Sequence, residues 1–278
     1  MSRGLGDVYK RQFLKTPELV RPTEPAELGE RCYQFEDVHF AYNEAEILHG
    51  ISFQTQPGTM TAIVGPSGSG KSTIAKLMAG FWDVTSGTVH FGGQDIRSIP
   101  FGQLMGEISY VAQDNFLFDK SIRENIRMGN PDASDEEVEA AAKAANCHDF
   151  IMQLEQGYDT MAGDAGARLS GGERQRITIA RAMLKQASVI ILDEATAYAD
   201  PENEALIQQA ISKLVVGKSL IVVAHRLNTI RNADQILVVA NGEIVGRGIQ
   251  EELLQSCPLY RKMWQDYTGS TEGGAEDV

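Results

Sequence analysis

The sequence predicts an α/β fold built on a mostly parallel sheet, and three observations support this prediction. Short apolar runs with strand character alternate with amphipathic helical segments over the second half of the chain, which is the pattern of strands joined by crossover helices. One early strand leads straight into a glycine-rich turn and a helix. Between these two regions lies a stretch rich in Ala and Glu, which predicts a helical insert.

The composition is that of an ordinary globular protein, and it narrows the range of functions. Of the 278 residues, 38 are acidic and 25 are basic, which gives a formal net charge of −13. Non-specific nucleic-acid binding depends on Lys and Arg contacts with phosphates, so we expect no nucleic acid among the partners. No apolar run approaches the roughly 20 residues that a transmembrane helix needs. The three cysteines are far apart, and we expect free thiols rather than disulfides or a zinc site.

Composition also divides the chain. Residues 1–12 share no pattern with the rest of the chain, and we interpret them as a cloning scar or an unstructured start. Residues 13–32 carry three prolines among glutamates, which predicts an extended, solvated linker. The patterned domain is expected to span residues 33–267. Residues 268–278 are rich in Gly and Glu, and we expect them to be disordered.

Within the domain, β-branched runs and apolar stripes at helical spacing mark the expected elements. The expected strands are 33–40, 60–64, 189–192, 220–223 and 236–239, and the expected helices are 72–79, 173–185 and 202–215. A helical subdomain is expected at about 114–175. Inside it, Ser134 and Glu137 have the spacing of a capping box, in which each side chain bonds to the other residue's backbone N–H, and they predict a helix start.

The strongest local signal is a phosphate-binding loop. Residues 65–72 match the pattern GxxxxGK[ST] between a strand and a helix. The glycines let backbone N–H groups point at phosphate oxygens, and the helix start adds its positive dipole end. We expect Lys71 to reach the β- and γ-phosphates and the Ser72 hydroxyl to hold Mg²⁺. The expected phosphate-binding residues are Gly65, Pro66, Ser67, Gly68, Ser69, Gly70, Lys71, Ser72 and Thr73.

Two carboxylates complement this loop. The apolar run Val189–Leu192 ends in Asp193 and Glu194. Such an ending is a weak pattern by itself, and its place after a full phosphate loop makes it informative. Asp193 is expected to bind Mg²⁺, directly or through water, and Glu194 is expected to polarise the water that attacks the γ-phosphate.

A second anion-binding helix start is predicted at residues 169–173, which read Leu-Ser-Gly-Gly-Glu. Ser170 can cap the helix, and Gly171 and Gly172 leave backbone N–H groups open to a ligand. One nucleotide needs only one such cradle from one chain. The second turn therefore favours a site shared with a partner subunit.

Taken together and in order, these motifs resemble those of the nucleotide-binding domain of ATP-binding-cassette (ABC) transporters. The matching positions are 65–72, Gln113, 169–173, 193–194 and His225. The resemblance covers residues 33–267, and the Leu-Ser-Gly-Gly element is specific to this superfamily. It implies a P-loop NTPase (RecA-like) core with an antiparallel β subdomain and a helical subdomain, and it implies an ATPase that uses ATP and Mg²⁺.

The resemblance also implies how the nucleotide is held. Tyr42 matches the aromatic side chain that stacks on adenine. Gln113 matches the glutamine that approaches Mg²⁺ and couples the site to the membrane domain. Ser170, Gly171 and Gly172 match the turn that closes over the γ-phosphate bound by the other subunit.

The implied catalytic residues come directly after the two later strands. Glu194 matches the catalytic base, and His225 matches the switch histidine that contacts the γ-phosphate and orients water. Asp200 matches the aspartate of the loop that communicates between the two sites of a dimer. Residues 197–199 read Ala-Tyr-Ala where the common pattern is Ser-Xaa-Leu, which puts the usual coupling in question. The same loop resembles the version in paired transporters that handle iron–siderophore complexes.

Other segments resemble the exporter-fold branch of this family. They are residues 121–126 and the loop 163–166, where Asp164 stands in place of the usual Glu. In that branch the membrane domain precedes the ATPase domain in one polypeptide, so we interpret 13–32 as a linker from a missing transmembrane domain. The implied partners are that domain and a second ABC ATPase domain, in a homodimer or a heterodimer, at the cytoplasmic face of the inner membrane.

Three alternatives make different predictions. A soluble ABC ATPase of DNA repair would carry a long coiled coil between the phosphate loop and Ser170, and a translation factor would carry two cassettes and a basic linker. A subunit that binds ATP without turnover would lack Glu194 or His225, and both are present. The sequence favours an ATP-driven half-transporter motor that moves a small molecule, either an iron–siderophore complex or a lipophilic compound.

Overall fold

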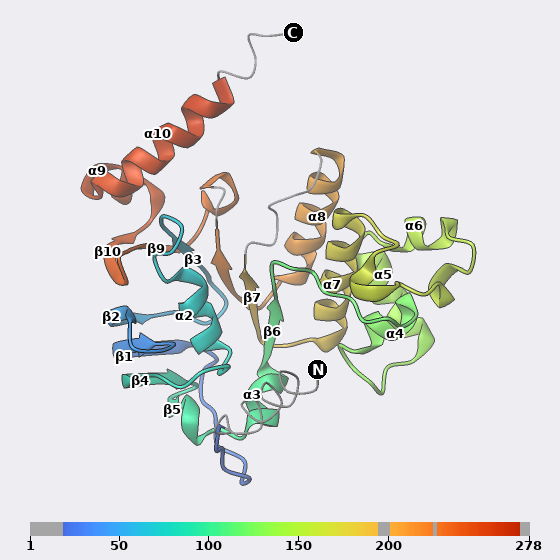
Figure 1. Ribbon diagram of the computed structural model, residues 1–278, viewed down its shortest axis with the longest axis horizontal. Coiled ribbons are helices and arrows are strands. Elements are labelled where there is room, and N and C mark those ends of the chain that lie inside the picture. Colours follow the sequence, from blue (N-terminus) through green and yellow to red (C-terminus); the bar gives the residue numbers. More distant parts are fainter. Residues whose placement is uncertain (1–18, 194–200, 225–226, 273–278) are drawn as a thin grey trace, which may run out of the picture.

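The computed structural model describes residues 19–193, 201–224 and 227–272, which form two sheets and a helical subdomain (Figure 1). The large sheet has the strand order β10-β9-β3-β8-β7-β6, and the small sheet has the order β2-β1-β4-β5. Helices α4 to α6 lie at the opposite end of the molecule from the small sheet, and α7 and α8 stand between them and the large sheet (Figure 1).

The described residues form strands, helices and short 3-10 turns with the following bounds. The strands are β1 (Tyr33–Ala41), β2 (Glu46–Gln54), β3 (Met60–Val64), β4 (Ser86–Phe91), β5 (Gln94–Asp95), β6 (Ile108–Val111), β7 (Val189–Asp193), β8 (Ser219–Val223), β9 (Gln235–Ala240) and β10 (Glu243–Gly248). The helices are α2 (Lys71–Met78), α3 (Phe101–Glu107), α4 (Ile122–Arg127), α5 (Asp135–Ala144), α6 (His148–Gln153), α7 (Gly171–Lys185), α8 (Pro201–Leu214), α9 (Gln250–Ser256) and α10 (Pro258–Glu272). Short 3-10 turns lie at η1 (Ile96–Ser98), η2 (Gly157–Asp159), η3 (Asp164–Gly166) and η4 (Leu227–Ile230).

The large sheet confirms the predicted mostly parallel core. Strands β9, β3, β8, β7 and β6 run parallel, and β10 joins the edge antiparallel to β9. Every residue of β7 is buried, and so are four of the five residues of β3, as expected for strands covered on both faces. Because parallel strands present their carboxyl ends at the same edge, the segments that come after β3, β6 and β7 meet there.

The small sheet is antiparallel and is tied to helix α2. Strand β1 pairs with both β2 and β4, and the rings of Phe35 and Phe53 stack with their centroids 4.5 Å apart. The buried hydroxyl of Tyr33 donates to the carbonyl oxygen of Met78 at 2.8 Å. Burial raises the pKa of Tyr33 well above its usual value, so the hydroxyl remains a donor. This bond fixes the end of α2 against the sheet.

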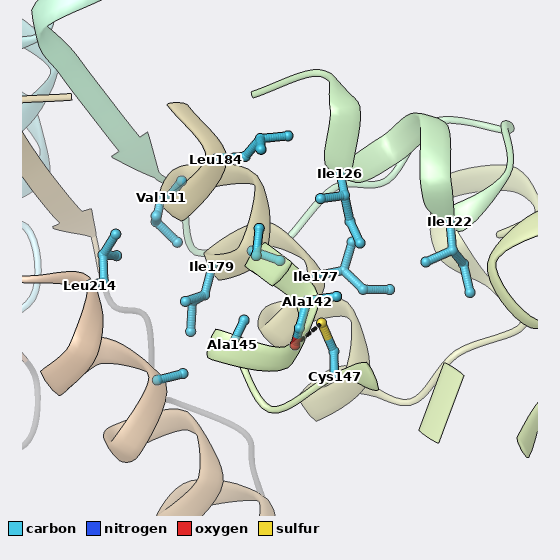
Figure 2. Packing of buried hydrophobic residues seen from close by; sticks show 14 of the residues in the cluster. Val111, Ile122, Ile126, Ala142, Ala145, Cys147, Ile177, Ile179, Leu184 and Leu214 are labelled. Atoms are coloured by element: carbon cyan, nitrogen blue, oxygen red, sulfur yellow. Dashed lines mark hydrogen bonds between the residues drawn. The ribbon is translucent and has the colours of Figure 1, made fainter. Parts of the chain in front are cut away.

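The helical subdomain closes around a core that it shares with β6, β7 and α8. Figure 2 shows Ile122, Ile126 and Ile177 in this core, on helices α4 and α7. The Cys147 thiol donates to the carbonyl oxygen of Ala142 at 3.2 Å, and burial raises its pKa to about 12. The thiol is therefore protonated at neutral pH, and all three cysteines are free, as predicted.

The predicted capping box is present at the start of α5. The Ser134 hydroxyl oxygen accepts from the Glu137 N–H at 3.3 Å, and the Glu137 carboxylate accepts from the Ser134 N–H at 2.8 Å. Both bonds satisfy backbone donors that have no partner within the helix. The acidic residues of the first turn also face the positive end of the helix dipole.

Helices α9 and α10 cover one face of the large sheet at β3 and β9, through a core that includes Leu253 and Tyr260. Helix α10 continues to Glu272, beyond Thr268, where the sequence suggested that disorder begins. The Thr268 hydroxyl donates to the Trp264 carbonyl oxygen at 3.1 Å, one turn earlier in the helix. None of the helices in the described residues is both long enough and apolar enough to cross a bilayer.

Residues 19–32 form no helix or strand and most of them are exposed, but the segment is held to the domain at several points. Arg21 makes a bidentate ion pair with Asp83, and the side chain of Arg21 is only 5% exposed. Further along, the Gln103 carboxamide bonds to both the N–H and the carbonyl oxygen of Ala26. Composition predicted the extended conformation, and these long-range bonds explain why the segment is nevertheless held in place.

The helical core generates a stability prediction. Ile177 is completely buried on α7, so Ile177→Ala leaves a cavity and should lower the free energy of unfolding by about 2–5 kcal/mol. Urea denaturation monitored by circular dichroism measures this change.

Val216→Ala provides the matched control, because Val216 is 77% exposed. This change should alter the free energy of unfolding by less than about 0.5 kcal/mol. Equal costs for the two substitutions would contradict the description of this core.

Candidate functional site

The turn between β3 and α2 can be made only with glycine at two positions. Gly65 has φ +151°, and a Cβ atom there would lie 1.9 Å from the carbonyl oxygen of Val239. Gly70, the N-cap of α2, has φ +104°, and its Cβ would lie 2.6 Å from Leu48 Cδ2. At Gly65 the loop passes so close to the backbone of β9 that a side chain would displace it, and at Gly70 the positive φ favours glycine.

This turn forms a cradle for an anion. Residues 67–73, together with Ile47, line a cavity of about 250 Å³. The buried hydroxyl oxygen of Ser69 has no hydrogen-bond partner among the described residues. Helix α2 begins at Lys71, so the positive end of its dipole lies at the cradle. An orphaned hydroxyl and a helix start fit a phosphate group.

Lys71 lies beneath this cradle and is 4% exposed. Its ammonium group donates to the carbonyl oxygens of Gly65 and Pro66 at 3.0 and 2.8 Å. These bonds hold the charged end of the side chain against the loop. A phosphate in the cradle would lie within the field of this positive charge.

A pair of oxygen ligands adjoins the cradle. Asp193, at the carboxyl end of β7, is 6% exposed. Its Oδ1 accepts from the Ser72 hydroxyl at 2.9 Å. Hydroxyl and carboxylate oxygens are ligands that Mg²⁺ prefers, so this pair fits a magnesium ion beside the phosphates. The structure thus brings together two of the three residues that the sequence assigned to the metal.

Tyr110 completes the contacts of Asp193, and the sequence did not identify it as a site residue. Its hydroxyl donates to Asp193 Oδ2 at 2.6 Å. Burial and this bond raise the pKa of Tyr110 well above its usual value, so it remains a donor. Tyr110 lies in β6, which runs parallel to β7. The sequence could have indicated Tyr110 as a site residue, because a tyrosine near the carboxyl end of a parallel strand lies at the edge of the sheet where ligands bind.

Ser72 and Asp193 open into a cleft of about 800 Å³. The cleft is lined by Ser72, Lys76, Phe81, Tyr110, Ala112, Gln113, Asp114, Asn115, Gly171, Arg174, Gln175 and Asp193. Gln113 is exposed on its wall, in the segment directly after β6. Ser72, Gln113 and Asp193, the three expected Mg²⁺ ligands, therefore face one space.

The second predicted anion-binding turn starts helix α7. The Ser170 hydroxyl oxygen accepts from the Glu173 N–H at 3.3 Å, and the Glu173 carboxylate accepts from the Ser170 N–H at 2.8 Å, so the turn is a capping box. Ser170 and Gly171 are exposed, and Gly172 is buried. Gly171 also lines the cleft that contains Ser72. The turn presents backbone N–H groups at the surface, where another molecule can reach them.

Tyr42 lies on the opposite side of the cradle, directly after β1. Its hydroxyl lies 3.4 Å from the Thr73 hydroxyl on α2. Its ring packs edge-to-face with Phe40 and Trp82, at centroid distances of 4.8 and 5.2 Å. The structure therefore places an aromatic ring beside the phosphate loop, where a nucleotide base could contact it.

Three predicted residues, Glu194, Asp200 and His225, lie outside the described residues. The strands that precede Glu194 and His225 are neighbours, because Asp193 of β7 pairs with Val223 of β8. Both strands end at the edge of the sheet that carries the phosphate loop.

Comparison with known proteins agrees with this geometry. The family model described as ABC transporter matches residues 48–197. The chain is 50% identical over 238 residues to the mycobactin import ATP-binding/permease protein IrtA of Mycolicibacterium smegmatis, covering 85% of this chain and 28% of that protein. It is 48% identical over 240 residues to human ATP-binding cassette sub-family B member 6, covering 86% of this chain and 28% of that protein.

A further relative and a solved structure agree. The ATP-dependent lipid A-core flippase of Syntrophus aciditrophicus is 44% identical over 251 residues, covering 90% of this chain and 42% of that protein. The structure of a bacterial Atm1-family ABC exporter with ATP bound superposes with a TM-score of 0.88 at 39% identity, covering 96% of this chain and 48% of that chain. The chain therefore spans less than half the length of these relatives. The family match and the superposition confirm the predicted fold class.

The close approach of the loop to β9 generates a prediction. Gly65→Ala should weaken the binding of a nucleoside triphosphate by about tenfold or more, because the new methyl group displaces the loop from the carbonyl oxygen of Val239. Isothermal titration calorimetry with a non-hydrolysable analogue measures the affinity. Gly102→Ala, in a helix where the added carbon meets nothing within 4 Å, is the control and should bind as the native chain does. Native affinity in Gly65→Ala would refute the account of the loop.

Proposed function

This chain belongs to the ABC transporter family, and on that premise we propose that it is the ATP-hydrolysing motor of a half-transporter that moves a small molecule across a membrane. The single observation that carries the proposal is the joining of the phosphate cradle to the Ser72–Asp193 pair. A phosphate site and an oxygen-rich metal site in contact are what Mg²⁺-bound ATP requires.

ATP would be held by different groups at its two ends. The backbone of residues 65–73 and the Lys71 ammonium would hold the β- and γ-phosphates, and Tyr42 would stack on the adenine. Ser72 and Asp193 would hold Mg²⁺, with Gln113 approaching from the cleft wall. When bound, Mg²⁺ neutralises the negative charge that the phosphates carry during transfer.

Hydrolysis would depend on residues that come after β7 and β8. We assign Glu194 the role of general base toward the attacking water, because it directly follows Asp193 at the metal end of the site. His225 would contact the γ-phosphate and orient the water. The assignment of Glu194 derives from its place after Asp193, and that of His225 from the resemblance to the ABC transporter family.

A second ATPase domain, identical or related, would complete each site. The N–H group of the exposed Gly171 suits the γ-phosphate held by a partner, whereas the Ser170 N–H already donates to the Glu173 carboxylate. Asp200 would lie in the loop that links the two sites. ATP would then favour a closed dimer, and hydrolysis would release it, which is a ligand-driven population shift.

The membrane-spanning part would belong to the same full-length polypeptide, and this chain would act at the cytoplasmic face of the inner membrane. The likeness to a mycobactin import protein supports an iron–siderophore complex as cargo, and the likeness to a lipid A-core flippase supports a lipophilic compound. A soluble ABC ATPase of DNA repair or translation is less well supported, because these relatives are named as a permease and a flippase.

The proposal predicts the behaviour of Glu194→Gln. Removal of the base should leave ATP bound and reduce hydrolysis at least about a hundredfold, since general-base catalysis contributes about 10²–10⁴-fold. Trapped ATP should also hold two chains together, which size-exclusion chromatography with light scattering detects.

Lys71→Ala in the same background is the control. It should lose ATP affinity and remain monomeric, because the charge that holds the phosphates is gone. Substantial hydrolysis by Glu194→Gln would refute the assignment of the base, and a monomer at saturating ATP would refute self-pairing.

A further inference from the structure

We propose that Trp82 is a positioning residue for the nucleotide base, because its indole holds the Tyr42 ring in the orientation that stacks on a purine. This inference rests on the function proposed above, and it adds a residue to which no role has been assigned. Trp82 lies in the turn directly after α2, far from Tyr42 in the sequence and adjacent to it in space.

The Tyr42 ring is held on several sides. Trp82 meets it edge-to-face at 5.2 Å and 84°, and Phe40 meets it at 4.8 Å and 88°. Phe40 is buried, at 2% exposure, and packs against Tyr42 from the protein interior. Trp82 is 44% exposed and packs against Tyr42 from the solvent side. The contact between the Tyr42 and Thr73 hydroxyls ties the ring to the phosphate loop helix. Removal of Trp82 would free the ring on its outer side alone.

The turn that carries Trp82 is itself well anchored. The next residue, Asp83, makes the bidentate ion pair with Arg21, whose side chain is nearly fully buried. Gly80, at the start of the turn, has φ +68°, and a Cβ atom there would lie 2.7 Å from Leu104 Cδ2. A side chain on such a turn can act as a rigid wall rather than as a mobile surface group.

The same turn also contacts the metal end of the site. Phe81, beside Trp82, packs edge-to-face on Tyr110 at 5.3 Å, and Tyr110 donates to Asp193. One short turn thus supports the candidate base-contacting ring with one aromatic side chain and the Asp193 partner with the next. Both supporting rings are partly exposed, Phe81 at 41% and Trp82 at 44%, because each contacts its partner ring on one side only.

The chain supplies its own reporter for this proposal. The sequence contains two tryptophans, Trp82 and Trp264. Trp264 packs near Tyr267 on α10, in a core separate from the site. In Trp264→Phe, which serves as the reference protein, the tryptophan emission comes from Trp82. Its emission should change when MgADP binds and should not change when pyrophosphate binds.

The decisive experiment is a double-mutant cycle in the 278-residue Trp264→Phe chain, with affinities for MgADP and pyrophosphate measured by calorimetry. Trp82→Ala should weaken MgADP binding about three- to tenfold, the range that one aromatic pair supports, and leave pyrophosphate affinity unchanged. Trp82→Phe should retain most of the affinity. Tyr42→Ala together with Trp82→Ala should be no weaker than Tyr42→Ala alone, because Trp82 acts through Tyr42.

The outcomes separate this inference from the proposed function. Additive losses in the double variant, or an equal loss for MgADP and pyrophosphate, would overturn the role of Trp82 while Tyr42 keeps its own. Unchanged MgADP affinity in Tyr42→Ala would overturn the proposed base site, and the role of Trp82 with it. Unaltered pyrophosphate binding in Trp82→Ala shows that the variant is folded.

Discussion

The hydrogen bond between Ser72 and Asp193 joins the two halves of the candidate site, and the remaining geometry depends on it. These residues are 121 positions apart in the sequence. They meet because β3 and β7 are parallel strands of one sheet, separated only by β8, so that the segments after both strands emerge at the same edge. The helical subdomain is inserted between these strands in the sequence, and it adds the α7 turn to the same cleft.

The site also shows how an acidic chain can hold a polyanion. With a net charge of −13, the molecule as a whole repels ATP. The cradle relies on short-range groups instead, which are backbone N–H groups, the start of α2 and the Lys71 ammonium. Beyond about 8–10 Å, physiological salt screens the exposed acidic residues. Local geometry therefore outweighs the overall charge.

Sequence reasoning recovered the features that depend on neighbouring residues. The buried strands, the phosphate loop and the Ser134 capping box derive from periodicity, glycine spacing and short-range bonds, and the structure has them where they were expected. The resemblance to ABC transporters also supplied Tyr42 and Gln113, which no local pattern would have distinguished.

The features that were missed are the strands β2, β4, β5, β6 and β10, for which no residue range was predicted, and contacts between distant segments. Tyr110 of β6 reaches Asp193 of the neighbouring strand β7, 83 positions away in the sequence, and Arg21 reaches Asp83 across 62 residues. Trp82 contacts Tyr42 because the turn after α2 packs against the end of β1. None of these contacts leaves a repeating pattern in the sequence, since each is set by how the sheets and α2 pack together.

The central claim is that each ATP lies between the phosphate loop of one chain and the Ser170–Gly172 turn of another. The most direct test mixes two inactive variants, Lys71→Ala and Gly171→Asp. The aspartate places a negative charge at the exposed start of α7, where it repels the partner's phosphate but remains compatible with the helix dipole. Each alone should hydrolyse no ATP. An equal mixture should regain hydrolysis, because each mixed dimer joins the intact phosphate loop of Gly171→Asp to the intact Ser170–Gly172 turn of Lys71→Ala and therefore has one complete site. A mixture as inactive as its components would show that the two motifs do not meet across copies of this chain.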